Sequence, residues 1–287
     1  MKILALGDFH GTFPEKLKGK IAKEKFDVVI GVGDYTGISE WRPYIMKQLR
    51  LALKGIQLTP KEYFGKERFR DLLKKDYAAG KKVLNEMNKL KKPTFIVFGN
   101  GDWYKYPFDK KIESERKSYE QFVKKLKHLK NINYNKAKFQ KINFVGFGGY
   151  MDIDAYFDRK KWKEDGIERH EARVNRRTKS RKHFFNILKK TKGEKIFVFH
   201  YPPKGAFDII RDKKDNPMNG KSTGISFFTE AIKRYKPRLV LCGHMHEYQG
   251  LKYLHGSPII NPGDAEEGKA AIITLEENKE VKVKFIK

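Results

Sequence analysis

The chain has 287 residues, of which 63 are Lys or Arg and 35 are Asp or Glu, so its formal net charge is +28 at pH 7. Hydrophobic residues make up 39% of it and aromatic residues 13%, which is enough for a sizeable core and excludes a mainly disordered protein. The positive charge favours polyanionic partners such as nucleic acid, nucleotides or anionic membrane surfaces. A Lys-rich surface that only solvates the protein is an equally good explanation.

The cysteine content and the N-terminal residues limit the cellular context. The single cysteine, Cys242, excludes an intramolecular disulfide and a zinc site built from several cysteines. The first apolar run ends at Asp8, short of the ~7–15 apolar residues of a signal peptide. No stretch reaches the ~18 apolar residues that cross a bilayer. We therefore expect a soluble cytoplasmic protein with no membrane partner.

Short apolar runs that end in a polar or glycine-rich cluster recur along the chain. Runs of this length, bounded by turn signals, predict buried strands. In chain order they are Ile3–Leu6, Val28–Val32, Phe95–Phe98, Phe144–Phe147, Ile196–Phe199 and Leu239–Cys242.

Longer segments with helical spacing of apolar residues lie between these runs. They are Leu72–Leu90, Tyr119–Leu129 and Phe227–Tyr235. Alternation of strand and helix predicts an α/β fold. The last part of the chain differs, because three strand-like runs follow one another without helices and predict an antiparallel closing portion. These runs are Tyr248–Leu254, Ala270–Leu275 and Val281–Ile286.

Two basic segments separate predicted core strands. Residues 41–92 contain 15 basic and 5 acidic residues, and residues 158–192 contain 14 and 5, so the two segments carry +10 and +9 of the net charge. We interpret both as mainly helical insertions in one domain that spans residues 1–287. Their charge makes them the candidate surface for nucleic acid.

Two phosphate-binding patterns match in part and then fail. Gly31-Val32-Gly33 follows a predicted strand, but the third glycine of a dinucleotide fingerprint is replaced by Thr36. Gly220-Lys221-Ser222 resembles the end of a P-loop, but the opening glycine is replaced by Asp215. The sequence therefore supports neither a nicotinamide-dependent enzyme nor a P-loop NTPase.

The polar clusters after the apolar runs contain residue types that bind metals. Asp8 and His10 are two residues apart, as are His244 and His246, so each pair points to one face of an extended backbone. In α/β sheets, functional groups collect beyond the carboxyl ends of the strands. The seven candidates at such positions are Asp8, His10, Asp34, Asn100, His200, His244 and His246. Seven ligands are too many for one tetrahedral ion and suit two ions that share a carboxylate.

Six short motifs surround these candidates along the chain. They are Gly7-Asp8-Phe9-His10-Gly11, Gly33-Asp34, Gly99-Asn100-Gly101-Asp102, Phe199-His200-Tyr201-Pro202-Pro203, Gly243-His244-Met245-His246 and Asn261-Pro262-Gly263. Taken together, they resemble the motifs of the calcineurin-like metallophosphoesterase superfamily, and in particular of its small prokaryotic and archaeal members of unassigned substrate. The resemblance extends over roughly residues 1–264, apart from the two basic segments. It implies a four-layer α/β/β/α sandwich with the dimetal site at the strand ends.

The resemblance also implies a division of the ligands between two divalent ions, with Asp34 bridging them. A hydroxide shared by the ions would then attack phosphorus in line. The ligand types suit Mn, which we expect first, and also Fe, Ni or Zn. The residues implied for the first ion are Asp8, His10 and His246, those for the second are Asn100, His200 and His244, and those with a catalytic role are Asp34, Asn100, Asp102 and His200.

One position departs from the family pattern. The third motif usually has a histidine over the substrate where this chain has Gly101, and the usual role of Asp102 in orienting that histidine is then in doubt. General-acid help is worth about 100- to 10,000-fold, so poor leaving groups should be affected most. The candidates for a replacement group are Tyr104, Tyr150, His170 and His183.

These observations favour a dimetal-dependent phosphoester hydrolase, and a phosphodiesterase acting on a nucleotide or nucleic acid above a monoesterase. One alternative is a phosphatase of proteins or small molecules, for which the missing histidine is a disadvantage. Another is a nucleic-acid-binding protein with weak catalysis on the same scaffold. The complete set of candidate ligands argues against that alternative.

Overall fold

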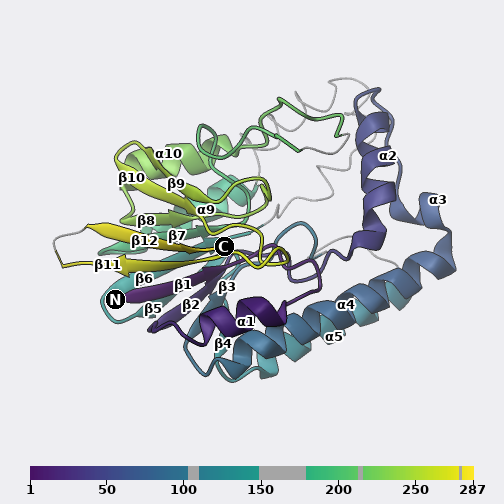
Figure 1. Cartoon of the computed structure of the whole chain (residues 1–287). Helices are drawn as coiled ribbons and strands as arrows, with labels where there is room; N and C mark the ends of the chain where they lie inside the picture. Colours follow the sequence, from purple (N-terminus) through teal and green to yellow (C-terminus); the bar gives the residue numbers. More distant parts are fainter. Residues whose placement is uncertain (103–109, 149–178, 213–215, 278–279) are drawn as a thin grey trace.

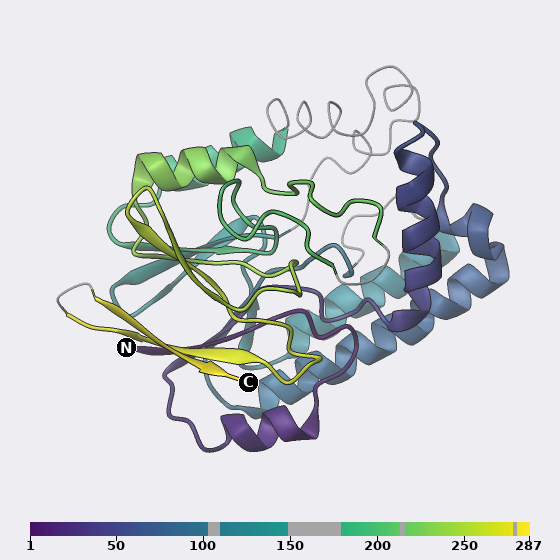
Figure 2. The same ribbon diagram turned by 45° about the horizontal axis from the view of Figure 1, so that its top comes forward.

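Two six-stranded sheets pack face to face, and helices cover the outer face of each sheet, as Figure 1 shows. This computed structural model describes residues 1–102, 110–148, 179–212, 216–277 and 280–287. The layers, seen again in the rotated view of Figure 2, follow the order α/β/β/α, which confirms the predicted α/β fold and its sandwich architecture.

The first sheet has a parallel centre and an antiparallel edge. Strands β1 to β4 pair in parallel, and β11 and β12 close the sheet with antiparallel pairing beside β1. In spatial order the strands are β12 (Val281–Ile286), β11 (Ala270–Leu275), β1 (Lys2–Leu6), β2 (Val28–Gly31), β3 (Thr94–Ile96) and β4 (Leu129–Asn131).

The second sheet also has a parallel centre, formed by β6, β7, β8 and β10, with an antiparallel strand at each edge. In spatial order the strands are β5 (Asn135–Phe139), β6 (Ile142–Phe147), β7 (Lys195–Phe199), β8 (Leu239–Leu241), β10 (Ser257–Asn261) and β9 (Gly250–Leu254). Of its parallel strands, β6, β7 and β8 were predicted, because each is a short apolar run that ends in a polar cluster.

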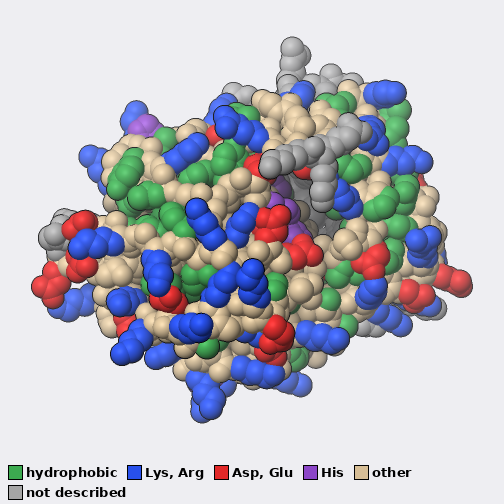
Figure 3. All heavy atoms as spheres, viewed as in Figure 1, with side chains coloured by type: hydrophobic (Ala, Val, Ile, Leu, Met, Phe, Trp, Pro, Cys, Tyr) green, Lys and Arg blue, Asp and Glu red, His purple; other side chains and the backbone are tan. Residues whose placement is uncertain are grey.

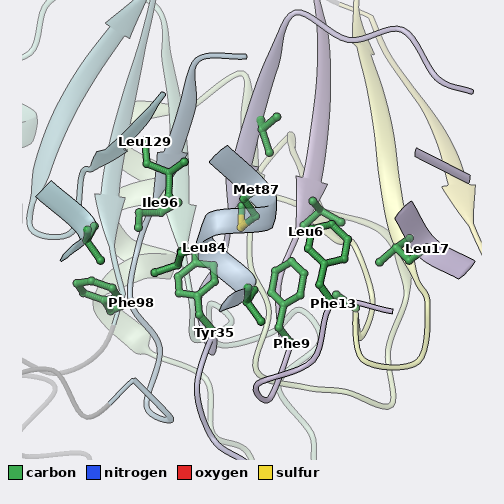
Figure 4. Close-up of a cluster of buried hydrophobic side chains, with 14 of the residues drawn as sticks. Leu6, Phe9, Phe13, Leu17, Tyr35, Leu84, Met87, Ile96, Phe98 and Leu129 are labelled. Carbon is green, nitrogen blue, oxygen red and sulfur yellow. The ribbon is translucent and has the colours of Figure 1, made fainter. Parts of the chain in front are cut away.

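Alternation along the strands fills three hydrophobic layers. Ile3 and Ala5 of β1 face the second sheet, whereas Leu4 and Leu6 face the helices on the other side. The helices over the first sheet are α1 (Glu15–Ile21), α4 (Lys66–Lys89) and α5 (Lys110–Lys125), and those over the second are α9 (Lys179–Lys189) and α10 (Ser226–Tyr235). Figure 4 shows Leu6 of the first sheet near Met87 and Leu84 of α4.

The predicted basic segment 41–92 is helical throughout most of its length. The short 3-10 helix Ser39–Trp41 ends at its first residue, and α2 (Arg42–Ala52), α3 (Pro60–Phe64) and α4 follow. Figure 1 places α2 beyond the end of the sheets toward which β1 runs from the N-terminus. Helix α4 is part of the helical layer over the first sheet. The assignment of residues 41–92 as an insertion stays a prediction.

The second predicted insertion, residues 158–192, lies outside the described residues up to residue 178. Its last part forms α9, in which Phe184 and Leu188 are buried in the layer over the second sheet. That the whole chain is one domain likewise stays a prediction.

Some element boundaries differ from the predictions. The helix expected over Tyr119–Leu129 ends with α5 at Lys125, because Leu129 pairs with Thr94 and begins β4. The C-terminal runs pair antiparallel as predicted, but β9 lies in the second sheet and β11 and β12 lie in the first. Within the described residues, no helix combines the length and the apolar character that spanning a bilayer requires. Cys242, directly after β8, is fully buried.

Candidate metal centre

The predicted ligands stand on the loops that leave the carboxyl ends of β1, β2, β3, β7 and β8. Four of them have a left-handed backbone, with φ of 56° at Asp8, 44° at His10, 54° at Asp34 and 70° at His244. Residues other than glycine rarely adopt this conformation, and such strain concentrates at functional sites. The loops after β1 and β2 hold each other, because the N–H groups of Asp8 and His10 donate to the carbonyls of Gly33 and Asp34 at 3.0 and 3.1 Å.

One ligand group combines residues from both sheets. Asp8, His10, Asp34 and His246 each offer one ligand atom, and these atoms lie within 4.8 Å of one another. The Nε2 atoms of His10 and His246 are 2.9 Å apart, and His246 Nε2 is 3.8 Å from Asp8 Oδ1. Two imidazoles and two carboxylates therefore face one point.

A second ligand group consists of Asp34, His200 and His244, under the same 4.8 Å limit. His200 Nε2 lies 3.4 Å from Asp34 Oδ2 and 2.8 Å from Asn100 Oδ1, so the amide oxygen of Asn100 belongs to this group as well. Asp34 is common to both groups. The structure thus brings all seven predicted ligands together, and the shared carboxylate lies where the resemblance implies a bridge.

The orientation of His200 suits a metal ligand. Its Nδ1 is 2.9 Å from the carbonyl oxygen of Val32, so this nitrogen donates its proton to the backbone. The lone pair of Nε2 is then directed at Asp34 and Asn100. Metal-binding histidines commonly fix their tautomer in this way, with the second nitrogen bonded to a carbonyl or carboxylate.

Glycines of the motifs leave the space that these side chains occupy. A Cβ atom on Gly99 would lie 2.1 Å from Asp34 Oδ1 and 2.6 Å from His200 Cε1. On Gly243 it would lie 2.6 Å from Asp8 Oδ2. Any other residue at these two positions would displace a ligand, which explains why glycine precedes these two ligand motifs.

The electrostatics of the centre fit divalent cations. Burial raises the pKa of Asp34 to about 6, and burial together with the Asp34 charge raises that of Asp8 well above its usual range. Among the described residues, the ion pairs of these two carboxylates are formed with histidines, and none is formed with Lys or Arg. Two buried carboxylates in such surroundings require positive charge from elsewhere.

Burial favours the neutral form of three of these histidines. Burial, and then the neighbouring His246, lowers the pKa of His10 to about 4, and burial lowers that of His200 to about 4. Burial and then the neighbouring His200 lower the pKa of His244 well below its usual range. Neutral imidazoles offer lone pairs to a cation. The donor set therefore fits the two divalent ions that the sequence predicted.

Asp102 has a different surrounding from the one that the family pattern implies. It is buried, and its carboxylate accepts the N–H groups of Gly99, Asp34, Tyr35 and Thr36 at 2.8 to 3.1 Å. Three of these hydrogen bonds, from Asp34, Tyr35 and Thr36, tie the loop after β3 to the loop after β2, and the one from Gly99 lies within the loop after β3. The carboxylate thus holds the backbone of the shared ligand Asp34.

Gly101 lies against that shared carboxylate. Its N–H group donates to Asp34 Oδ1 at 2.7 Å, and its φ lies outside the left-handed region. A Cβ atom here would lie 3.1 Å from Asp34 Oδ1 and from the Thr36 carbonyl. Of the possible replacements for the missing histidine, His183 bonds the Tyr134 carbonyl at 3.0 Å and belongs to neither ligand group. The other three lie outside the described residues: Tyr104, Tyr150 and His170.

The sequence reasoning missed Asp264, which also borders the centre. Its Oδ2 lies 3.8 Å from His246 Nδ1, and its side chain is 7% exposed. The available signal was its position directly after the Asn-Pro-Gly turn at residues 261–263. Figure 3 shows histidine side chains on the floor of a hollow in the molecular surface, with acidic side chains next to them.

Comparison with known proteins agrees with this geometry. A family model described as metallophosphoesterase, calcineurin superfamily, matches residues 1–286. A dimetal phosphatase from Danio rerio shares the fold with a TM-score of 0.56 at 10% identity, over 100% of this chain and 96% of that chain. The protein TT1561 of Thermus thermophilus gives 0.52 at 19% identity, over 100% and 99%. A search of curated proteins found no match.

Proposed function

The chain belongs to the calcineurin superfamily of metallophosphoesterases, and from that premise we propose that it is a dimetal phosphodiesterase acting on a nucleotide or a nucleic acid. Membership supports metal-dependent hydrolysis of phosphoesters in general. The preference for diesters and the nature of the substrate are argued below from the candidate centre and the surface charge.

Each ion would have its own ligands and share Asp34. When bound, two divalent ions neutralise phosphoryl charge and lower the pKa of a coordinated water. Mn is the ion we expect, because imidazole, carboxylate and amide oxygen together suit it, and Fe, Ni and Zn are the alternatives. The first ion would be held by Asp8, His10 and His246, and the second by Asn100, His200 and His244.

The chain's own hydrogen bonds preorganise this ligand set. The His244 N–H donates to both oxygens of Asp8, at 3.0 and 3.1 Å, which links the ligand loops of the two sheets. Asp34 Oδ1 is held by the Gly101 N–H, and His200 is held by Val32. Ligands fixed in this way need no reorganisation during the reaction, which is the main source of electrostatic catalysis.

Gly101 is the observation on which the diester preference depends. A histidine side chain at this position would extend over Asp34, where the phosphoryl group is expected to bind. Glycine places no side chain in that space, and a diester needs room there because its phosphorus carries a second organic substituent. Glycine also removes a proton donor whose loss is felt most with poor leaving groups.

The surface charge supports a polyanionic substrate. The net charge of the chain is +28, and α2 contributes Lys47 and Arg50 at the end of the sandwich where the ligands lie, whereas its Arg42 pairs with Asp212 at 3.1 Å. Long-range attraction by such charge raises the rate of encounter with phosphate chains. A phosphatase of proteins or small molecules is the second candidate, because the same ligand set also serves monoesters.

Two substrates with the same leaving group test the diester preference directly. We expect the Mn²⁺-loaded protein to hydrolyse bis(p-nitrophenyl) phosphate with a higher kcat/KM than p-nitrophenyl phosphate. Cyclic nucleotides, single-stranded oligonucleotides and a phosphopeptide should then be compared under the same conditions. Faster turnover of the monoester, or of the phosphopeptide, would contradict the phosphodiesterase proposal and favour the phosphatase.

A further inference from the structure

Five consecutive backbone N–H groups follow β2, and two buried carboxylates accept all of them. Asp102 accepts those of Asp34, Tyr35 and Thr36. Asp76 Oδ1 accepts the next two, from residue 37 at 2.6 Å and from residue 38 at 3.1 Å. The loop that begins with the shared ligand is therefore fixed by two separate acids, of which the second belongs to α4.

Asp76 is unusual for its place in the fold. It lies on the face of α4 that is packed into the core, between buried residues such as Leu73 and Tyr77, and it is itself fully buried. Its other oxygen, Oδ2, accepts the Nε1–H of Trp41 at 2.7 Å. A carboxylate is costly to bury unless its hydrogen bonds compensate the loss of water. Three N–H donors provide that compensation here.

The segment held by Asp76 touches a metal ligand. A Cβ atom on Gly37 would lie 2.9 Å from His10 Nδ1, so the backbone of residue 37 packs directly against that nitrogen. The other ring nitrogen of His10, Nε2, faces His246 Nε2 at 2.9 Å. The close packing of residue 37 against Nδ1 therefore limits how far the His10 ring can turn away from the centre.

We propose that Asp76 is a positioning residue for the first ion, acting through the Gly37 backbone on the orientation of His10. This inference rests on the proposed dimetal site. Asp76 holds residue 37 through hydrogen bonds, and residue 37 packs against His10 Nδ1. Loss of this support should weaken the ion bound by Asp8, His10 and His246 more than the ion bound by Asn100, His200 and His244.

The test is a titration of metal-free protein with Mn²⁺ alone, followed by counting bound Mn per chain and recording the EPR signal of the coupled ion pair. The wild type should bind two ions. Asp76→Asn has the shape of the native side chain but places an NH₂ group against an N–H donor. We expect it to lower the affinity for one of the two ions about 10-fold, the lower bound for loss of a group supporting a ligand.

A second substitution separates positioning from stability. Trp41→Phe removes the N–H donor that faces Oδ2 of Asp76. In the double variant Asp76→Asn/Trp41→Phe, the amide can therefore turn its NH₂ group toward residue 41 and its oxygen toward the N–H groups of residues 37 and 38. We expect this double variant to regain the affinity that Asp76→Asn loses. Leu73→Ala, one turn away on α4, should lower stability but retain the wild-type affinities for both Mn²⁺ ions.

The outcomes distinguish the inference from its premise. A wild type that binds fewer than two Mn²⁺ would contradict the dimetal site itself. A wild type with two ions and an Asp76→Asn variant with unchanged affinities would overturn the role of Asp76. Equal losses in Asp76→Asn and Leu73→Ala, or a double variant without recovery, would also overturn it, because the effect would then be general destabilisation.

Discussion

The carboxylate of Asp34 belongs to both ligand groups, and its two oxygens have different partners. Oδ1 accepts the N–H of Gly101, while Oδ2 faces His200 at 3.4 Å. The backbone of the same residue is held by Asp102. Side chain and main chain of Asp34 are thus fixed independently, as expected of a group that must keep its position between two cations.

Removing one ligand of the centre should therefore lower its metal content. We expect Asp34→Asn to lose turnover and to bind fewer ions, because it removes the charge that two cations would share, and His244→Ala to lose the second ion. Elemental analysis of the purified variants and their turnover of an activated diester measure both effects. His183→Ala is the matched control, since His183 bonds the Tyr134 carbonyl. A ligand variant with two metals and normal activity would contradict the assignment.

The substitution Gly101→His tests whether the missing histidine makes substrates with poor leaving groups react slowly. The φ of Gly101 lies outside the left-handed region. A Cβ atom at this position would require Asp34 and the Thr36 carbonyl to move away by only a few tenths of an ångström. We expect a gain of up to about 100-fold on alkyl leaving groups, the lower bound for general-acid catalysis, and little change on aryl ones. Rates across a series of leaving-group pKa values measure this. The same dependence in both proteins would show that another residue supplies the proton.

At the level of elements, most strands that are buried on both faces were predictable, and β10 is the exception. The central parallel strands are mostly continuous apolar runs, and their polar ends marked the site. Two of the missed strands have other patterns. β5 is mostly polar. β4 has only three residues, and because the apolar spacing before Leu129 continues that of α5, its start resembles the end of that helix. Their pairing with neighbours in the sheet, and not their local sequence, fixes them as strands.

The grouping of the seven candidate ligands was predictable because each lies in a polar cluster after an apolar run, whereas the residues that support them were not. Asp102 was identified, but its partners, the N–H groups of another loop, come together only in the fold. Asp76 left a weak signal: it is an acid on the apolar face of a helix, between Leu73 and Tyr77. A buried charge in such a stripe needs partners, and the sequence does not say which.

Helix α9 carries part of the positive charge of the predicted nucleic-acid surface. Arg181 forms two hydrogen bonds of 2.7 Å with Glu230 of α10, so its charge is compensated. Lys182 beside it is exposed. Of the basic segment 158–192, five further residues that we expect to contact phosphates lie outside the described residues: Lys160, Lys161, Arg173, Arg176 and Arg177.

Binding of duplex DNA should fall steeply with salt if this surface contacts phosphates. We expect a slope of about −3 or steeper in log K against log salt, since each contact contributes about −0.9. Lys182→Gln should reduce the slope by about one contact, and Arg181→Gln, the matched control, should change it less. Fluorescence anisotropy at several salt concentrations measures the slopes. Phosphate contacts are strong at ~50 mM salt. If the protein does not bind DNA under that condition, these residues only form a solvated surface.

For the whole molecule, the centre joins the two halves of the sandwich. Asp8, His10, Asp34 and Asn100 follow strands of the first sheet, and His200, His244 and His246 follow strands of the second. Ions bound between them would hold the sheets together at that edge. A ligand that binds only the folded state stabilises it, by about 2.7 kcal/mol at 100 times its Kd.

Removal of metal should therefore lower the melting temperature. We expect a decrease on the order of 5–10 °C between protein with Mn²⁺ at 100 times its Kd and protein in a chelator. Differential scanning calorimetry measures this directly. The melting temperature of Asp34→Asn should decrease much less when Mn²⁺ is removed, because this variant has lost the carboxylate that both ions would share. Equal melting temperatures of the wild type in Mn²⁺ and in chelator would mean that the ions do not link the sheets.

The burial of Cys242 makes its thiol a reporter of opening at this edge. Burial raises its pKa well above the usual range and excludes reagents, so alkylation must wait until the chain around β8 opens. Since His244 is two residues further on, that opening should require release of metal. We expect labelling, followed by mass spectrometry, to slow about 100-fold when Mn²⁺ is raised to 100 times its Kd. A labelling rate independent of Mn²⁺ would mean that β8 opens while the ions stay bound.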